Sequence, residues 1–118
     1  MLAERISNTE AQLPQELRNS AVILAGEMAW TAPDALRVVE WLCSQDVAVS
    51  GVELWRERDG CPQWIATSQP FPEVPVAAAH EAAQFIREFQ DFELHPENLF
   101  NMTWGVVPSA GMLIAQAA

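Results

Sequence analysis

The residues of this sequence best suited to binding or acid–base chemistry lie in one stretch, Val47 to Thr67. Glu53, Trp55 and Glu57 are spaced two apart, so on an extended strand their side chains share one face. A carboxylate beside an indole ring is one setting for a general acid or base, although such a residue is more often an exposed partner of a cross-strand Arg or Gln. Two tryptophans among acids also suit an Arg or Lys side chain of a partner. We take Glu53, Trp55, Glu57 and Trp64 as the candidate partner-binding residues and predict no catalytic residue.

The tryptophan pair also has a purely structural explanation. Large apolar side chains that stand together on one face of a sheet are usually covered by another element. A further helix or the N-terminal segment would then bury Trp55 and Trp64 as a second layer of core. The solvent exposure of Trp64 discriminates between the two interpretations.

Nucleophilic and metal chemistry find little support elsewhere in the chain. The sequence contains no glycine-rich phosphate loop, CxxC, HExxH or GxSxG motif. Cys61 with His80 is a conceivable thiol–imidazole pair, because the thiol lies next to basic Arg58, and it defines a less favoured alternative, a small thiol-dependent enzyme. His80 and His95 have no evident ligand partners, and a metal site needs three or four, so we expect no metal and no cofactor. Cys43, on an apolar helix face, is expected in the core.

Composition narrows the class of partner. At 118 residues we expect one domain spanning 1–118, and half of the residues are hydrophobic. Sixteen acids against six bases give a net charge of −10, and the chain contains no lysine. Nucleic acid and anionic membranes are therefore disfavoured, whereas a basic protein would be steered toward this surface. The acidity also has a simpler explanation in solubility. Two cysteines, no secretory leader and no long apolar run favour a cytoplasmic protein, whose oligomeric state stays open.

The candidate residues are positioned by a predicted β-hairpin. Asp59-Gly60 separates two runs rich in Val, Leu, Ile and Trp, and this dipeptide tolerates the positive φ angles of a two-residue turn. The turn places Trp55 opposite Trp64 and Leu54 opposite Ile65. The second strand is expected at a sheet edge, because Pro62 cannot donate to a neighbouring strand. A bulge is expected near Gly51, which precedes these residues.

Two helices and a third strand should complete the sheet. Apolar residues at helical spacing predict helices from Trp30 to Gln45, with a capping box at its start (Thr31 and Asp34), and from Val76 to Gln90. Alternation predicts a strand over Leu99 to Val107, with a further short strand over Met112 to Ile114. Near the N-terminus, the run that starts at Pro14 predicts a helix that ends at Gly26.

The segment from Trp30 to Trp64 resembles a known family. It combines an aromatic-capped helix (Trp30-Thr-Ala-Pro-Asp-Ala-Leu-Arg-Val-Val-Glu-Trp-Leu), a strand entering Gly51-Val-Glu-Leu-Trp, a hairpin turn and a second aromatic strand. This order is similar to the immunity protein 40 family, small immunity proteins of bacterial polymorphic toxin systems. Trp30, Gly51, Glu53 and Trp55 occupy positions of its pattern, and the chain has Gly51-Val52-Glu53 where members often carry two glycines and an acid. The resemblance implies a non-enzymatic protein that binds and neutralises a cognate toxin.

The sequence thus predicts an α+β domain, a small mainly antiparallel sheet with a central hairpin, packed by two or three helices. We expect it to act by stoichiometric binding, with its acidic surface occluding the active site of a basic toxin such as a nuclease. An alternative is an adaptor or chaperone for a secreted effector, since such proteins are also small, acidic and non-catalytic.

Overall fold

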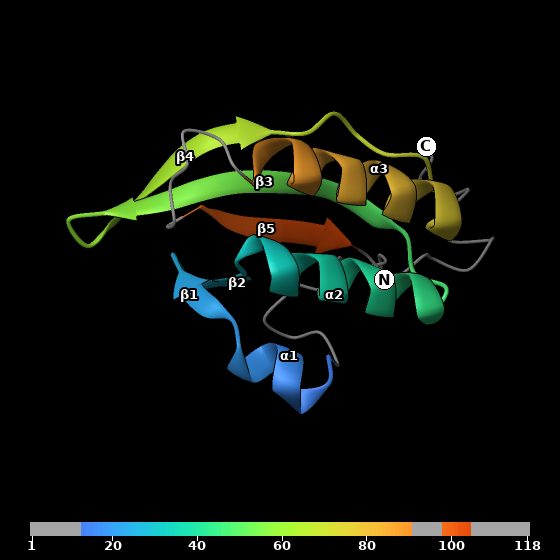
Figure 1. The fold of residues 1–118 in the computed structure, drawn as a ribbon, viewed down its shortest axis with the longest axis horizontal. Helices are drawn as coiled ribbons and strands as arrows, with labels where there is room; N and C mark the ends of the chain where they lie inside the picture. The colour runs from blue at the N-terminus through green and yellow to red at the C-terminus, as the bar shows by residue number, and fades with distance from the viewer. Residues whose placement is uncertain (1–12, 91–97, 105–118) are drawn as a thin grey trace, which may run out of the picture.

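A computed structural model describes residues 13–90 and 98–104 of the chain (Figure 1). Its helices and strands follow the order α1 (Gln15–Asn19), β1 (Val22–Leu24), β2 (Glu27–Ala29), α2 (Ala32–Ser44), β3 (Val49–Arg58), β4 (Cys61–Thr67), α3 (Pro75–Phe89) and β5 (Leu99–Trp104). The strands form two antiparallel sheets, one of order β1-β2 and one of order β4-β3-β5. Because α2 and α3 lie side by side over one face of the larger sheet, the predicted α+β class is confirmed.

The turn between β3 and β4 has the predicted geometry. Asp59 and Gly60 have φ angles of 53° and 78°, the two positive values that a tight hairpin turn of this kind needs. Trp55 pairs with Trp64, as expected from that turn, and Pro62 pairs with Glu57. Within residues 13–90 and 98–104, β4 stands at the end of the strand order, so the strand with Pro62 is an edge strand of the described sheet, as predicted.

Beyond the tryptophan pair the predicted register is wrong. Leu54 pairs with Ala66 rather than with Ile65, because the register shifts between Leu54 and Trp55 and leaves Ile65 as an extra residue in β4. Such a bulge lets Ile65 and Ala66 both pack against the main core, so Ala66 does not lie on the tryptophan side as expected. A second shift between Val49 and Gly51, in the pairing of β3 with β5, agrees with the bulge predicted there.

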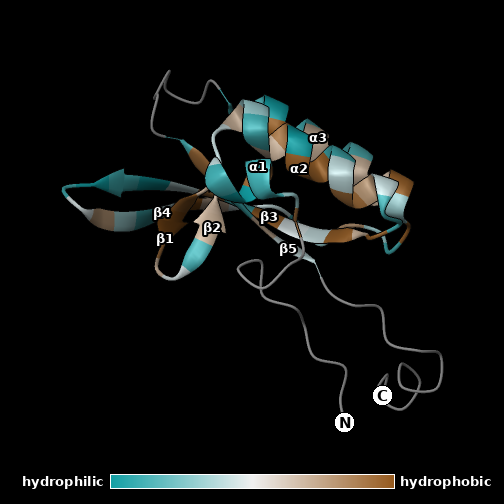
Figure 2. Ribbon diagram, turned by 90° about the horizontal axis from the view of Figure 1, so that it is seen from below, coloured by the Kyte–Doolittle hydropathy of each residue, from teal (hydrophilic) through white to brown (hydrophobic). Residues whose placement is uncertain are grey.

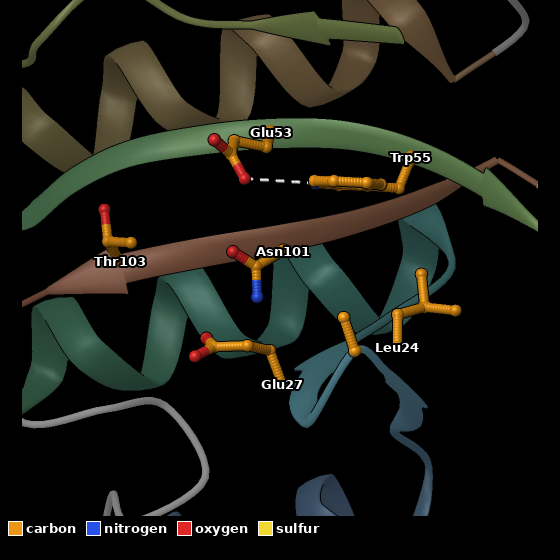
Figure 3. Close-up of a pocket in the computed structure, with 7 residues that line it drawn as sticks. Leu24, Glu27, Glu53, Trp55, Asn101 and Thr103 are labelled. Carbon is orange, nitrogen blue, oxygen red and sulfur yellow. Dashed lines mark hydrogen bonds between the residues drawn. The ribbon is translucent and has the colours of Figure 1, made fainter. Parts of the chain in front are cut away.

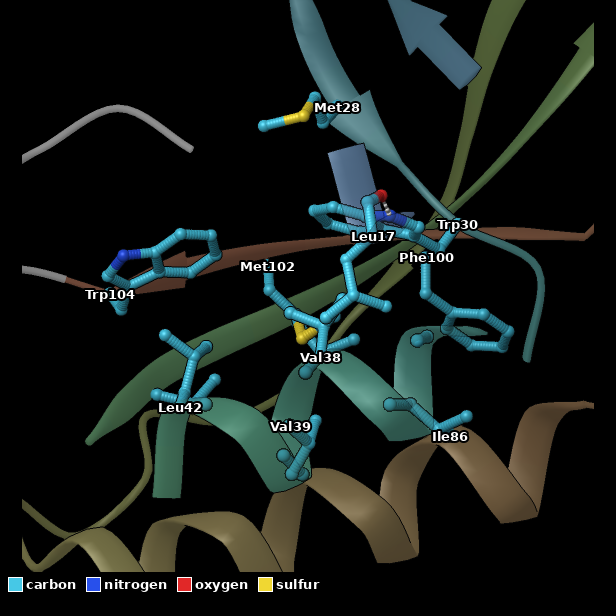
Figure 4. Packing of buried hydrophobic residues seen from close by; sticks show 14 of the residues in the cluster. Leu17, Met28, Trp30, Val38, Val39, Leu42, Ile86, Phe100, Met102 and Trp104 are labelled. Carbon is cyan, nitrogen blue, oxygen red and sulfur yellow. Dashed lines mark hydrogen bonds between the residues drawn. The ribbon is translucent and has the colours of Figure 1, made fainter. Parts of the chain in front are cut away.

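The main core lies between the helices and the sheet (Figure 4). α2 and α3 turn their apolar stripes inward, and full burial of each Val, Leu or Ile side chain contributes about 1.5–3 kcal/mol. The side chains of Val38, Leu42 and Ile86 reach the sheet residues Phe100 and Met102. Both helices agree with their predicted bounds within two residues at each end.

The expected capping box at the start of α2 does not form. Thr31 is the N-cap residue, with extended backbone angles, but its side chain makes no capping hydrogen bond. Asp34 instead accepts a hydrogen bond from Arg37 at 3.3 Å. The start of α2 is therefore stabilised by Pro33 in the first turn and by burial of the apolar face of the helix, and not by a capping side chain.

The N-terminal helix prediction is wrong in its second half. α1 spans only Gln15–Asn19, and the chain then forms the β1-β2 hairpin around Ala25 and Gly26, whose φ angles are 50° and 82°. The hairpin is tied to the larger sheet at its far end, where the backbone N–H and C=O groups of Trp30 and Phe100 pair at 2.9 and 2.7 Å. The helix thus starts after Pro14 as predicted, but pairing with β5, a long-range contact, replaces its predicted continuation to Gly26.

Some predicted segments lie outside the described residues, and the search for a membrane-spanning helix covers only the described ones. His95 and the predicted strand over Met112 to Ile114 lie outside the described residues, as does the end of the predicted Leu99 to Val107 strand. In the part of the chain that is described, no helix is both long and apolar enough to cross a membrane.

Candidate functional site

The candidate site lies on the sheet face opposite α2 and α3. Alternation along β3 sends Val52 and Leu54 toward the helices, whereas Glu53 and Trp55 point to the other side. On β5, Asn101 is the register partner of Glu53 and points the same way. Figure 2, viewed from below, shows the β1-β2 hairpin under the sheet, on the side away from the helices.

Trp55 is half-buried between the sheet and this hairpin. It packs against a small second cluster formed by Leu24, Ala29 and Leu99. Its indole Nε1 donates a hydrogen bond of 3.0 Å to Oε1 of Glu53, two residues earlier on the same strand. The bond holds the carboxylate beside the ring (Figure 3), so the half-covered tryptophan fixes the position of the acid.

Trp64, the cross-strand partner of Trp55, is 56% exposed. Its Nε1 donates a 2.7 Å hydrogen bond to Oγ1 of Thr67. The bulge at Ile65 brings these two side chains to the same face, although they are three residues apart. Each of the two interpretations of the tryptophan pair therefore holds for one of its members. The N-terminal hairpin covers Trp55, as expected if the pair were core, whereas Trp64 stays in solvent, as expected of a binding residue.

A pocket of ≈ 190 Å³ lies between the sheet and the hairpin (Figure 3). The sheet contributes Glu53, Trp55, Asn101 and Thr103, and the hairpin contributes Leu24, Ala25 and Glu27. Two of the four predicted residues, Glu53 and Trp55, are thus brought together in a hollow. Glu57 and Trp64 are exposed and do not line it.

Sequence reasoning missed Glu27 and Asn101, which complete the pocket. Glu27 pairs with Leu24 next to the Ala25-Gly26 turn, and only the hairpin geometry directs it toward β3. The signal that could have revealed it is the apolar run Val22-Ile23-Leu24 followed by a glycine-containing turn, which is typical of a hairpin. Asn101 is a polar residue in the alternating pattern of Leu99 to Val107, which is typical of an exposed position, yet it is only 7% exposed.

Hydrogen bonds leave the pocket rich in acceptors. Nδ2 of Asn101 donates to the carbonyl of Met28 at 2.9 Å, so its Oδ1 faces the side of Glu53 and Thr103 (Figure 3). The Thr103 hydroxyl is paired with that of Ser50 at 3.0 Å. The carboxylates of Glu53 and Glu27 lie on either side of Asn101. The pocket therefore presents two negative charges and an amide oxygen beside a flat aromatic ring, which suits a cation.

Two arginines, Arg37 and Arg56, form their contacts away from this pocket. Arg37 of α2 forms ion pairs with Glu16 at 2.6 Å and with Asp34 at 3.3 Å, and the hydrogen bond to Glu16 raises the pKa of Arg37. Arg56 is 5% exposed on the helix side, where its Nε donates to Oδ1 of Asn98 at 2.8 Å. Neither arginine lines the pocket.

The thiol and imidazole candidates are not brought together. Cys61 is exposed beside the β3-β4 turn, at the hairpin tip that projects away from α3 in both views (Figures 1 and 2). His80 is exposed on α3, and within the described ranges no hydrogen bond joins the two. Cys43 is half-buried on α2 rather than fully buried in the core as expected. Across residues 13–90 and 98–104, no group of three or more His, Cys, Asp or Glu could hold a metal ion.

Comparison of the chain with models of known protein families, with curated proteins and with solved structures gives no match.

Proposed function

We propose that this chain is a binding protein that neutralises a cognate bacterial toxin by forming a stoichiometric complex. The observation that carries the proposal is the sheet face left free by α2 and α3. It presents Trp64, 56% exposed, next to the indole and carboxylate of Trp55 and Glu53. Tryptophan is one of the residue types that most often dominate a protein–protein interface, and acids beside an indole ring suit an Arg or Lys of the partner.

Charge supports a basic partner. The chain carries a net charge of −10 and no lysine, so a basic toxin would associate with it faster than a neutral protein of the same size. The resemblance of the Trp30 to Trp64 segment to immunity proteins points to the same class of partner. In this proposal the acidic face covers the active site of the toxin, and the action takes place in the cytoplasm.

Co-expression tests the proposal directly. Cells that express the toxin encoded next to this chain should survive when the chain is present and die when it is absent. The Trp64→Ala variant should protect less well, whereas Glu81→Gln, an exposed change on the outer side of α3, should protect fully. Equal killing with and without the chain would refute the proposal.

An adaptor or chaperone for a secreted effector is the second candidate. The observation that favours it is that β4 has no strand on its outer side among the described residues, because an extended secretion segment can add to an edge strand. A truncation series of the partner separates the two functions. An adaptor would retain binding to the secretion segment alone, whereas a toxin-neutralising protein would retain binding to the toxic domain alone.

A further inference from the structure

We propose that the pocket between the β1-β2 hairpin and the sheet receives an arginine side chain of the partner protein. The inference rests on the proposed function, in which a basic protein binds this face, and names the chemical group that the face recognises. It adds Glu27 and Asn101 to Trp55 and Glu53, the two residues of the pocket that were predicted from the sequence.

The charges and hydrogen-bonding groups of the pocket select a donor-rich cation. Glu27 and Glu53 supply carboxylates from β2 and β3, and Asn101 of β5 supplies an amide oxygen between them. The indole N–H of Trp55 and the amide N–H of Asn101 already donate to Glu53 and Met28. An anion would thus meet two like charges, whereas a guanidinium would meet several acceptors at once.

The shape of the pocket favours arginine over lysine. Its acceptors come from three adjacent strands, and the planar guanidinium has five N–H groups that point in fixed directions toward such a spread of acceptors. The Trp55 ring forms a flat wall on which a guanidinium can stack. The lysine ammonium is a compact point charge with three donors, and it cannot stack in this way.

The pocket is held in place before a ligand arrives. Glu53 is fixed by Trp55, and Asn101 by the carbonyl of Met28 at 2.9 Å. Leu24 and Trp55 pack in the second hydrophobic cluster, which joins the hairpin to the sheet. Groups that are already ordered lose little conformational freedom on binding, so an incoming arginine meets a preformed site.

The first experiment titrates the isolated protein with N-acetyl-arginine methylamide and follows the indole N–H signals by ¹H–¹⁵N NMR. The Trp55 signal, assigned with Trp55→Phe, should shift saturably with a dissociation constant in the millimolar range, because its hydrogen-bond acceptor Glu53 engages the ligand. The citrulline analogue, which has similar shape but no charge, should cause no saturable shift at equal ionic strength. The lysine analogue should bind several-fold more weakly. Absence of a saturable Trp55 shift with the arginine compound, or equal shifts with citrulline, would overturn the proposal.

Matched charge-removing variants show whether the arginine compound binds in this pocket or elsewhere on the acidic surface. Glu27→Gln and Glu53→Gln should each weaken binding of the arginine compound at least fivefold, and Glu53→Gln retains an oxygen that can accept from Trp55. Glu81→Gln, which removes one charge from the outer side of α3, should leave binding unchanged. Equal weakening by all three variants would show only a general charge effect and would overturn the proposal.

The two proposals can fail separately. Because the titration needs no toxin, a saturable and charge-dependent shift supports the arginine pocket even if co-expression gives no protection. Conversely, protection by the chain without any effect of Glu27→Gln on toxin binding would support the proposed function and refute the pocket as its recognition site.

Discussion

Trp55 and Trp64 are direct cross-strand partners, yet their indole N–H groups serve different neighbours and their rings lie in different environments. Trp55 donates to Glu53 beneath the N-terminal hairpin, whereas Trp64 donates to Thr67 and is 56% exposed. One member of the pair therefore supports the structure of the pocket, and the other is available to a partner.

This division predicts unequal costs of truncation. Trp55→Ala removes a half-buried ring from the second cluster and should lower the free energy of unfolding by about 2–4 kcal/mol, near the lower end for buried aromatic residues. Trp64→Ala removes mainly a cross-strand contact and should cost about 1 kcal/mol or less. Urea unfolding followed by circular dichroism measures both. Equal losses would mean that Trp64 is also covered.

Reversal of the charge at Glu53 should affect binding more than folding. Glu53→Lys places a cation where a basic partner is expected, and we predict at least a tenfold loss of affinity, or about 1.4 kcal/mol. Glu81→Lys on α3 makes the same change in net charge away from the face and is the matched control. Titration calorimetry with the partner measures both affinities. Unchanged binding by Glu53→Lys would exclude this face from the interface.

Gly60 and Gly26 should be sensitive to substitution for conformational reasons alone. Both have positive φ angles, 78° and 82°, and a Cβ at either position would meet no atom within 4 Å. Alanine at either site should therefore cost about 1–2 kcal/mol through backbone strain, and asparagine less. Chemical denaturation of the four variants tests this expectation, which fails if alanine and asparagine are equally well tolerated.

Asn101 should control the attachment of the N-terminal hairpin. Asn101→Leu removes a buried hydrogen bond to the carbonyl of Met28 and should lower the free energy of unfolding by about 1–3 kcal/mol. Amide hydrogen exchange should accelerate most in β1 and β2. Asn19→Ala, which removes only an exposed contact with Gln15 on α1, is the control. Acceleration spread evenly over all strands would contradict a local role.

Local pattern predicted those parts of the fold whose signals lie within a few residues. Asp59-Gly60 specified the turn because both residues tolerate positive φ, and the register next to the turn followed from its length. The register failed at Ile65, five residues after Gly60, because a bulge that packs the half-buried Ile65 and Ala66 against the core depends on the helices above them. Burial against another element leaves no trace in the spacing of the strand itself.

The candidate site was likewise predictable where it depends on neighbouring residues of the sequence and unpredictable where it depends on distant ones. By itself, the sequence determined that Glu53 and Trp55 share a face with Trp64 across the hairpin, because side chains alternate along strands. Only the tertiary structure decided that the hairpin closed by Ala25-Gly26 covers Trp55 but not Trp64, and that Glu27 and Asn101 join Glu53 and Trp55 in one pocket. The physical reason is that these outcomes depend on the pairing of Trp30 with Phe100, a contact between residues far apart in the chain, which no local propensity encodes.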